Sequence, residues 1–297
     1  MTSATIDLLG KDFWAWRDAT VFRSADDIPR IAHSPLWIPR FDLESVQERR
    51  ATLGGFVERW RAIDASAEPI ESQVDYRLIG SAIARVHWEL DVMQPWQRDA
   101  VFAASQILGP YYDLLLKPAP FEADRQDGLV NALRAMPAQV LVAQTNLTAG
   151  GVTELAAVAA ELLGTISVDL TQSVAALTPL VSASTASQLA SAVGPAVTAL
   201  AGFASWLEAE GPNMVGVTPV GREGFEWYLR HVALIPSTPE SLVAAAEQEY
   251  NRSVAWEIAG RTRPAGPRGS PRRAKSSTPP RRRTNGPCVS STRAAAS

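Results

Sequence analysis

Residues 219–258 read PVGREGFEWYLRHVALIPSTPESLVAAAEQEYNRSVAWEI and predict two helices joined by a short turn. Apolar residues recur at spacings of three and four in the first half, which is the period of one helix face. Pro236 should end this helix, Thr238 can cap the next, and Pro239 suits a first helical position. A second long helix is then expected through residue 258. The apolar positions of the first helix are Phe225, Tyr228, Leu229, Val232 and Ile235.

Upstream of this stretch the pattern is helical as well, and the body at 41–260 is predicted to be an all-α, elongated multi-helix domain. Asp42 should cap a helix over 42–63, and Pro69 should open another with an apolar stripe at Ile79, Ile83, Val86 and Leu90. Prolines predict breaks at Gly109-Pro110, before Pro137 and near Pro179, and a bend or break at Gly194-Pro195. The expected pieces between 122 and 210 are 124–135, a helix ending near 147, a loop over 148–151, and at least two helices over 152–210.

The two ends differ in composition from the body. Residues 1–40 contain three tryptophans and three prolines, and we expect an extended segment there, anchored by its tryptophans. Residues 261–297 hold nine Arg, one Lys and no acidic residue, with almost no large apolar side chain. Such a composition cannot offset the entropy of ordering, so this tail is expected to be disordered.

Charge and cysteine usage restrict the function. The net charge is −3, but without the tail the first 260 residues hold 18 basic and 31 acidic side chains. An acidic body does not favour nucleic acid or anionic lipid as a partner. The single cysteine, Cys288, and the absence of a signal-peptide pattern favour the cytoplasm. The longest uncharged run, 170–207, is rich in Ala, Ser and Thr and broken by prolines, so no membrane span is expected.

Two stretches carry a resemblance to a known family: QVDYRLIGSAIARVHWELDVMQPWQRDAVF, within 73–121, and VGREGFEWYLRHVALIPSTPESL, within 219–243. Over residues 40–258 the chain resembles the bacterial family called domain of unknown function 885. The resemblance implies a mostly helical zinc metallopeptidase whose HExxGH-type motif lies downstream of the 219–258 helix pair. The sequence contains no such motif, so we expect an inactive, truncated relative, without metal or other cofactor in this chain and with zinc only in a full-length one.

The residues give little sign of catalysis on their own. His33, His87 and His231 are separated in sequence, and zinc needs three or four converging ligands. His87 and Asp91 are four apart and can share a helix face, for which we expect a structural role. We therefore predict no catalytic and no metal residues.

Three residues of the first 219–258 helix are candidates for a substrate groove: Arg222, Glu226 and Arg230. The two arginines could hold a peptide carboxylate, and ordinary surface ion pairing, with Glu226 and Arg230 in the favourable order, explains them equally well. A peptide-like ligand is thus the expected partner. Self-association through uncovered 219–258 helices is a second expectation.

Alternatives to the inactive relative are a non-catalytic helical binding or scaffold protein and a nucleic-acid binder acting through the basic tail. The tail lacks aromatic residues for base stacking, which weighs against the nucleic-acid binder. Its composition also matches a GC-rich gene read out of frame. Composition, charge and resemblance all change near residue 260, which favours an inserted or deleted base near the codons for Ala259–Arg263.

Overall fold

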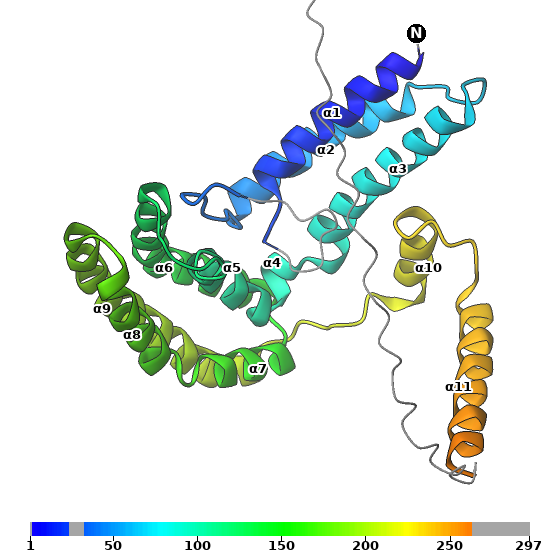
Figure 1. Ribbon diagram of the computed structural model, residues 1–297. Coiled ribbons are helices and arrows are strands. Elements are labelled where there is room, and N and C mark those ends of the chain that lie inside the picture. Colours follow the sequence, from blue (N-terminus) through cyan, green and yellow to red (C-terminus); the bar gives the residue numbers. More distant parts are fainter. Residues whose placement is uncertain (1, 24–32, 263–297) are drawn as a thin grey trace, which may run out of the picture. The chain divides into compact units, whose positions relative to one another are not determined.

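The computed structural model describes residues 2–23 and 33–262, and all the regular elements in these ranges are helices (Figure 1). The predicted all-α class is therefore confirmed.

The chain divides into a first unit, residues 1–239, and a second that begins at Glu240. Of the tail predicted over 261–297 to be disordered and frame-shifted, residues 261 and 262 are helical and the rest lies outside the described residues. The elements of the first unit are α1 (Thr2–Thr20), α2 (Leu43–Arg61), α3 (Ile70–His87), the π-helix η1 (Trp88–Met93), α4 (Pro95–Arg98), α5 (Ala100–Asp113), α6 (Ala123–Gly150), α7 (Thr153–Leu163), α8 (Ile166–Leu177), the 3₁₀ turn η2 (Thr178–Leu180), α9 (Ala183–Glu210), the 3₁₀ turn η3 (Gly211–Asn213) and α10 (Gly221–His231).

The expected N-terminal extended segment is wrong for its first half, because residues 2–20 form helix α1. Ile6, Leu9 and Phe13 are spaced by three and four and are at most 1% exposed, so α1 buries a regular apolar stripe. The prolines that suggested an extended chain all follow residue 28 and cannot interrupt this helix. The described part of the segment after α1, residues 33–41, does run without helix.

Side-chain amides of α6 hold this non-helical segment in place. Asn131 Nδ2 donates to the Leu36 carbonyl at 3.1 Å, Gln139 Nε2 to that of Pro39 at 3.2 Å, and Asn146 Nδ2 to that of Phe41 at 2.8 Å. The three donors are seven or eight residues apart and so lie along one face of the helix. They satisfy carbonyl groups that have no strand or helix partner in this stretch.

The segment leads into α2, where the predicted cap is confirmed. Asp42 lies outside the helix and its carboxylate accepts a hydrogen bond from Ser45 N at 2.8 Å, which lowers the pKa of Asp42 against the opposing effect of burial. The α3 stripe is confirmed too, since Ile79, Ile83 and Val86 are buried and Leu90 follows in η1. Helices α1, α2 and α3 pack against one another (Figure 1).

Three of the four prolines at which the sequence predicted a break or bend lie inside continuous helices. Pro110 lies inside α5, Pro137 inside α6 and Pro195 inside α9, and the expected loop at 148–151 is mostly the last turn of α6. Each proline removes one backbone hydrogen bond, at a cost of about 3 kcal/mol. Adjacent residues offset this cost by complete burial: Tyr111 and Met136 have no exposed surface. The break near Pro179 is confirmed, as Pro179 falls in the turn η2 between α8 and α9.

The core around these helices is formed mainly by α5 to α9, with α6 and α9 packed along each other. Leu133 and Ala143 of α6 and Leu200 and Phe203 of α9 are all fully buried. Together with η3, α9 is long and apolar enough to cross a membrane by length and composition. Core helices of soluble proteins meet the same test, and the buried face of α9 packs against α6, α7 and α8.

The 219–258 stretch forms two helices, as predicted, but the first is shorter than expected. Helix α10 ends at His231, because the backbone turns at Leu234 (φ 54°) and the Ile235 N–H bonds the Leu229 carbonyl at 2.7 Å. Val232 and Ile235 therefore lie beyond the helix instead of on its face. The second helix, α11 (Pro239–Thr262), is the described part of the second unit. Most of its large apolar residues are exposed, among them Trp256 at 80%, and self-association through this helix stays a prediction.

A glycine substitution tests how closely the 33–41 segment approaches α6. A Cβ on Gly128 would lie 2.3 Å from the Pro35 carbonyl oxygen, whereas one on Gly202 of α9 meets nothing within 4 Å. Gly128→Ala should lower the free energy of unfolding by about 1–3 kcal/mol, as overpacking does. Gly202→Ala should raise it by about 0.5–1 kcal/mol through helix propensity. Urea unfolding followed by circular dichroism measures both, and equal effects would show that Gly128 does not control this contact.

A candidate binding groove

A groove of about 740 Å³ lies within the first unit, between α2, α3, η1 and α10. Its inner wall is apolar, with Leu53 of α2 and Ile83 of α3 both buried. Trp60 and Trp227 add half-buried aromatic walls on two sides. An apolar floor with a polar edge is the usual composition of a ligand-binding cleft.

The Trp60 wall depends on a glycine of α3. A Cβ at Gly80 would lie 2.5 Å from the Trp60 ring, so only glycine leaves space for the indole. The ring stacks on Tyr76 with centroids 5.0 Å apart, and its Nε1 donates to the Tyr76 carbonyl at 3.0 Å. Trp60 is thereby held in one orientation along the groove.

Asp91 organises the charged end of the groove. Its Oδ1 accepts from Arg50 Nε at 2.6 Å, and its Oδ2 lies 2.8 Å from His87 Nδ1. Arg50 Nη2 also donates to the Leu90 carbonyl at 3.2 Å. His87 and Asp91 thus share a face, as the spacing indicated. Asp91 contacts Arg50 of α2, and His87 contacts Asp91. The π-helix η1, which carries Asp91, is a type of turn found often at functional sites.

Aromatic and histidine rings attach α10 to the rest of the groove. Trp227 stacks on Trp88 with ring centroids 6.1 Å apart and planes 7° apart. His87 and His231 lie beside the same indole, at 5.4 and 5.1 Å. Ser81 Oγ of α3 donates to the Val232 carbonyl at 2.7 Å. The two histidines, which are far apart in sequence, therefore share one surface.

Only part of the predicted candidate set reaches this groove. Arg230 lines it, whereas Arg222 and Glu226 do not. Glu226 pairs with Arg222, with Arg222 Nε 2.8 Å from Glu226 Oε1, instead of the expected Arg230. This pair runs along α10 with the basic residue first, the reverse of the acid-first order that was expected.

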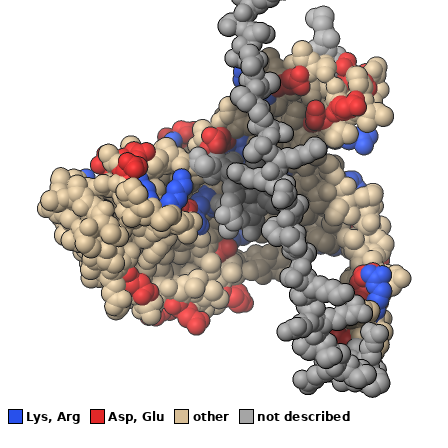
Figure 2. Space-filling model, in the orientation of Figure 1, with Lys and Arg blue, Asp and Glu red and all other residues tan. Residues whose placement is uncertain are grey.

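Sequence reasoning did not identify the other cationic residues of the groove, Arg50, Arg61 and Arg77. Arg50 and Arg61 are eleven residues apart, which is three helical turns, so they lie on the same face of α2. This spacing could have identified them from the sequence. Trp227, which forms a wall of the groove, lies in the stretch that resembles the family but was not among the predicted groove residues. On the face drawn in Figure 2, acidic side chains are scattered in small groups, in keeping with the acidic body. The arginines gathered around the groove differ from that background.

Zinc was tested against the groove residues because the family resemblance implies it. Among residues 2–23 and 33–262, no three His, Cys, Asp or Glu side chains lie close enough together to hold a metal ion. His87, Asp91 and His231 line the same groove without forming such a group. The described residues do not fit a zinc site.

Comparison with known proteins gives a fold and no family. No protein-family model matches the sequence, and no curated protein matches it. Among solved structures, the chain is similar to one described as "a putative lipoprotein of unknown function from Shewanella oneidensis", with a TM-score of 0.57 and 13% identity. The match covers 72% of this chain and 38% of that protein. At this identity the likeness concerns the fold alone.

The Asp91 network can be tested against the local pair on α10. Asp91→Ala removes an acceptor that joins α2 to η1, and it should lower the free energy of unfolding by on the order of 1 kcal/mol or more. Glu226→Ala removes an ion pair within one helix and should cost about 0.3–0.5 kcal/mol. Urea unfolding compares the two variants. A smaller loss for Asp91→Ala than for Glu226→Ala would contradict the network's role.

Proposed function

We propose that this chain is a non-catalytic helical binding protein, an inactive relative of the peptidases that the resemblance to domain of unknown function 885 implies, with the α2–α3–α10 groove as the site for an acidic peptide-like ligand. The proposal assigns binding and no hydrolysis to these residues. In a relative that carries the HExxGH motif, the same groove would present a peptide to the metal. The observation that carries the proposal is the concentration of arginines along an apolar groove in an otherwise acidic body.

Charge supports an acidic ligand. Arg50 is engaged by Asp91 at 2.6 Å, which leaves three lining arginines against one lining carboxylate, that of Glu58, among the described residues. Arg61, Arg77 and Arg230 come from three different helices and are all solvent-exposed. Planar guanidinium groups bind carboxylates with two parallel hydrogen bonds, which suits Asp, Glu or a terminal carboxylate.

The apolar floor supports a peptide over a simple anion. Leu53, Ile83 and Trp60 offer a surface that an isolated carboxylate would not use. A segment with acidic residues on both sides of one or two large apolar side chains fits both parts of the groove. Binding should therefore weaken with ionic strength without disappearing.

Arginine variants of α10 test the groove directly. The probe is a fluorescein-labelled Asp-Glu-Leu-Phe-Asp-Glu peptide, followed by fluorescence anisotropy. Arg230→Ala should weaken binding by about tenfold or more, because one charge-assisted hydrogen bond contributes about 1.5–3 kcal/mol. Arg222→Ala is the matched control on the same helix outside the groove, and its affinity should stay within a factor of two of wild type.

A neutral peptide separates charge recognition from apolar contact. Asn-Gln-Leu-Phe-Asn-Gln keeps the apolar centre and should bind at least tenfold more weakly than the acidic probe. Equal binding of the two peptides, or equal losses in Arg230→Ala and Arg222→Ala, would show that the groove is not an acidic-peptide site.

A further inference from the structure

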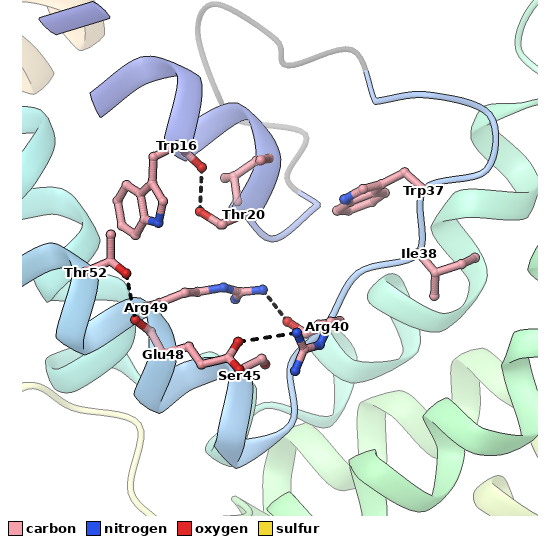
Figure 3. A pocket seen from close by; sticks show the side chains of 11 residues that line it. Trp16, Thr20, Trp37, Ile38, Arg40, Ser45, Glu48, Arg49 and Thr52 are labelled. Atoms are coloured by element: carbon pink, nitrogen blue, oxygen red, sulfur yellow. Dashed lines mark hydrogen bonds and ion pairs between the residues drawn. The ribbon is translucent and has the colours of Figure 1, made fainter. Parts of the chain in front are cut away.

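A second pocket, of about 370 Å³, lies on another face of α2 from the groove (Figure 3). Ser45, Arg49 and Thr52 contribute to it from α2, whereas the groove uses positions such as Arg50, Leu53 and Val57. The end of α1 and the segment after residue 36 complete the pocket. Trp16 and Trp37 lie on two sides, with the Arg49 side chain between them (Figure 3).

Arg49 is an unusual residue for this position, because it is only 8% exposed. Its Nη2 donates to the Arg40 carbonyl, and its guanidinium carbon lies 4.4 Å from the Phe22 ring centroid. Its Nη1 is buried and has no hydrogen-bond acceptor among the described residues. Burial lowers the pKa of Arg49 to about 10, and the nearby Arg17 charge acts in the same direction. A buried cation with an unused donor is costly to a fold.

The carboxylates of Asp42 and Glu89 partly offset the lowering of the Arg49 pKa, but no described group accepts a hydrogen bond from its Nη1. Thr20 Oγ1 donates to the Trp16 carbonyl at 2.8 Å, and Thr52 Oγ1 donates to that of Glu48 at 3.0 Å. The Glu48 carboxylate lies 3.3 Å from Arg40 Nη1.

Arg17, another cation that acts on Arg49, is paired as well. Arg17 Nη2 is bound by Glu89 at 2.7 Å. The pocket therefore combines aromatic walls with a buried cation whose Nη1 has no acceptor among the described residues.

We propose that this pocket binds a small organic oxyanion with a flat apolar body. A carboxylate or phosphoryl oxygen would accept the hydrogen bond from Arg49 Nη1, and the apolar body would lie against Trp16 and Trp37. The volume suits a ligand of about one ring with its anionic group, at the low end of the roughly 300–1,000 Å³ usual for ligand sites. The proposal does not depend on the groove, which lies on the other face of α2.

Ligand-observed NMR with three single-ring probes tests the proposal on the full chain. Benzoate carries a carboxylate, phenyl phosphate a phosphoryl group, and benzyl alcohol neither. We expect saturation transfer from the protein to at least one anion, with benzyl alcohol binding at least tenfold more weakly. The anion that binds more tightly identifies the oxyanion. Absence of binding by both anions, or equal binding by benzyl alcohol, would overturn the proposal.

Variants connect any binding to Arg49. Arg49→Met keeps the stem without the charge and should weaken anion binding at least tenfold, with a melting temperature no more than a few degrees below wild type. Arg230→Ala removes a groove arginine and should leave the affinity for benzoate or phenyl phosphate within a factor of two. Unchanged anion binding in Arg49→Met, or an equal loss in Arg230→Ala, would assign the binding elsewhere.

Two milder variants keep the test valid if Arg49→Met folds poorly. Arg49→Lys retains the charge but loses the planar fork of donors, and Trp37→Ala removes one half-buried wall. Each should weaken anion binding at least threefold. Wild-type affinity in both variants would overturn the proposal.

Discussion

The amide side chains of α6 hold the segment on which the rest of the first unit depends. A non-helical stretch in an all-α protein has no ladder to satisfy its carbonyl groups, and it packs against the body only if other donors meet them. Asn131, Gln139 and Asn146 supply those donors along one helix face. Gly128 extends the same face by letting the Pro35 backbone approach. The segment is thereby placed where Asp42 can cap α2.

Helix α2 then separates two sites with different electrostatics. On one face, Arg50 shares Asp91 with His87, and its charge is balanced inside the protein. On the other, Arg49 is more deeply buried, and one of its amino groups has no acceptor within residues 2–23 and 33–262. Adjacent residues of a helix point about 100° apart, so two neighbouring arginines serve two separate surfaces. Burying a cation without an acceptor for each donor costs free energy, so Arg49 does not contribute to stability in the way that Arg50 does.

The prolines inside α5 and α6 show why local sequence rules did not predict the helix ends correctly. The isolated cost of a helical proline is a few kcal/mol, and a sequence argument has only that cost to consider. In α5 and α6, tertiary burial of Tyr111 and Met136 outweighs the lost hydrogen bond, and the helices continue. The prediction of an extended segment over residues 1–40 was wrong at α1 for a related reason. It gave weight to the later prolines and not to the helical spacing of Ile6, Leu9 and Phe13, which are buried.

Sequence alone determined the helical class, the Asp42 cap, the buried stripe of α3 and the existence of two helices within 219–258. These follow from periodicity and capping, which act over a few residues and leave a direct mark in the chain. Only the tertiary structure decided that Arg230 belongs to a groove, that His87 and His231 flank Trp227, and that Arg49 is buried. Those facts depend on packing between helices far apart in sequence, and on which donors remain unpaired once packing is complete. No local pattern records either quantity.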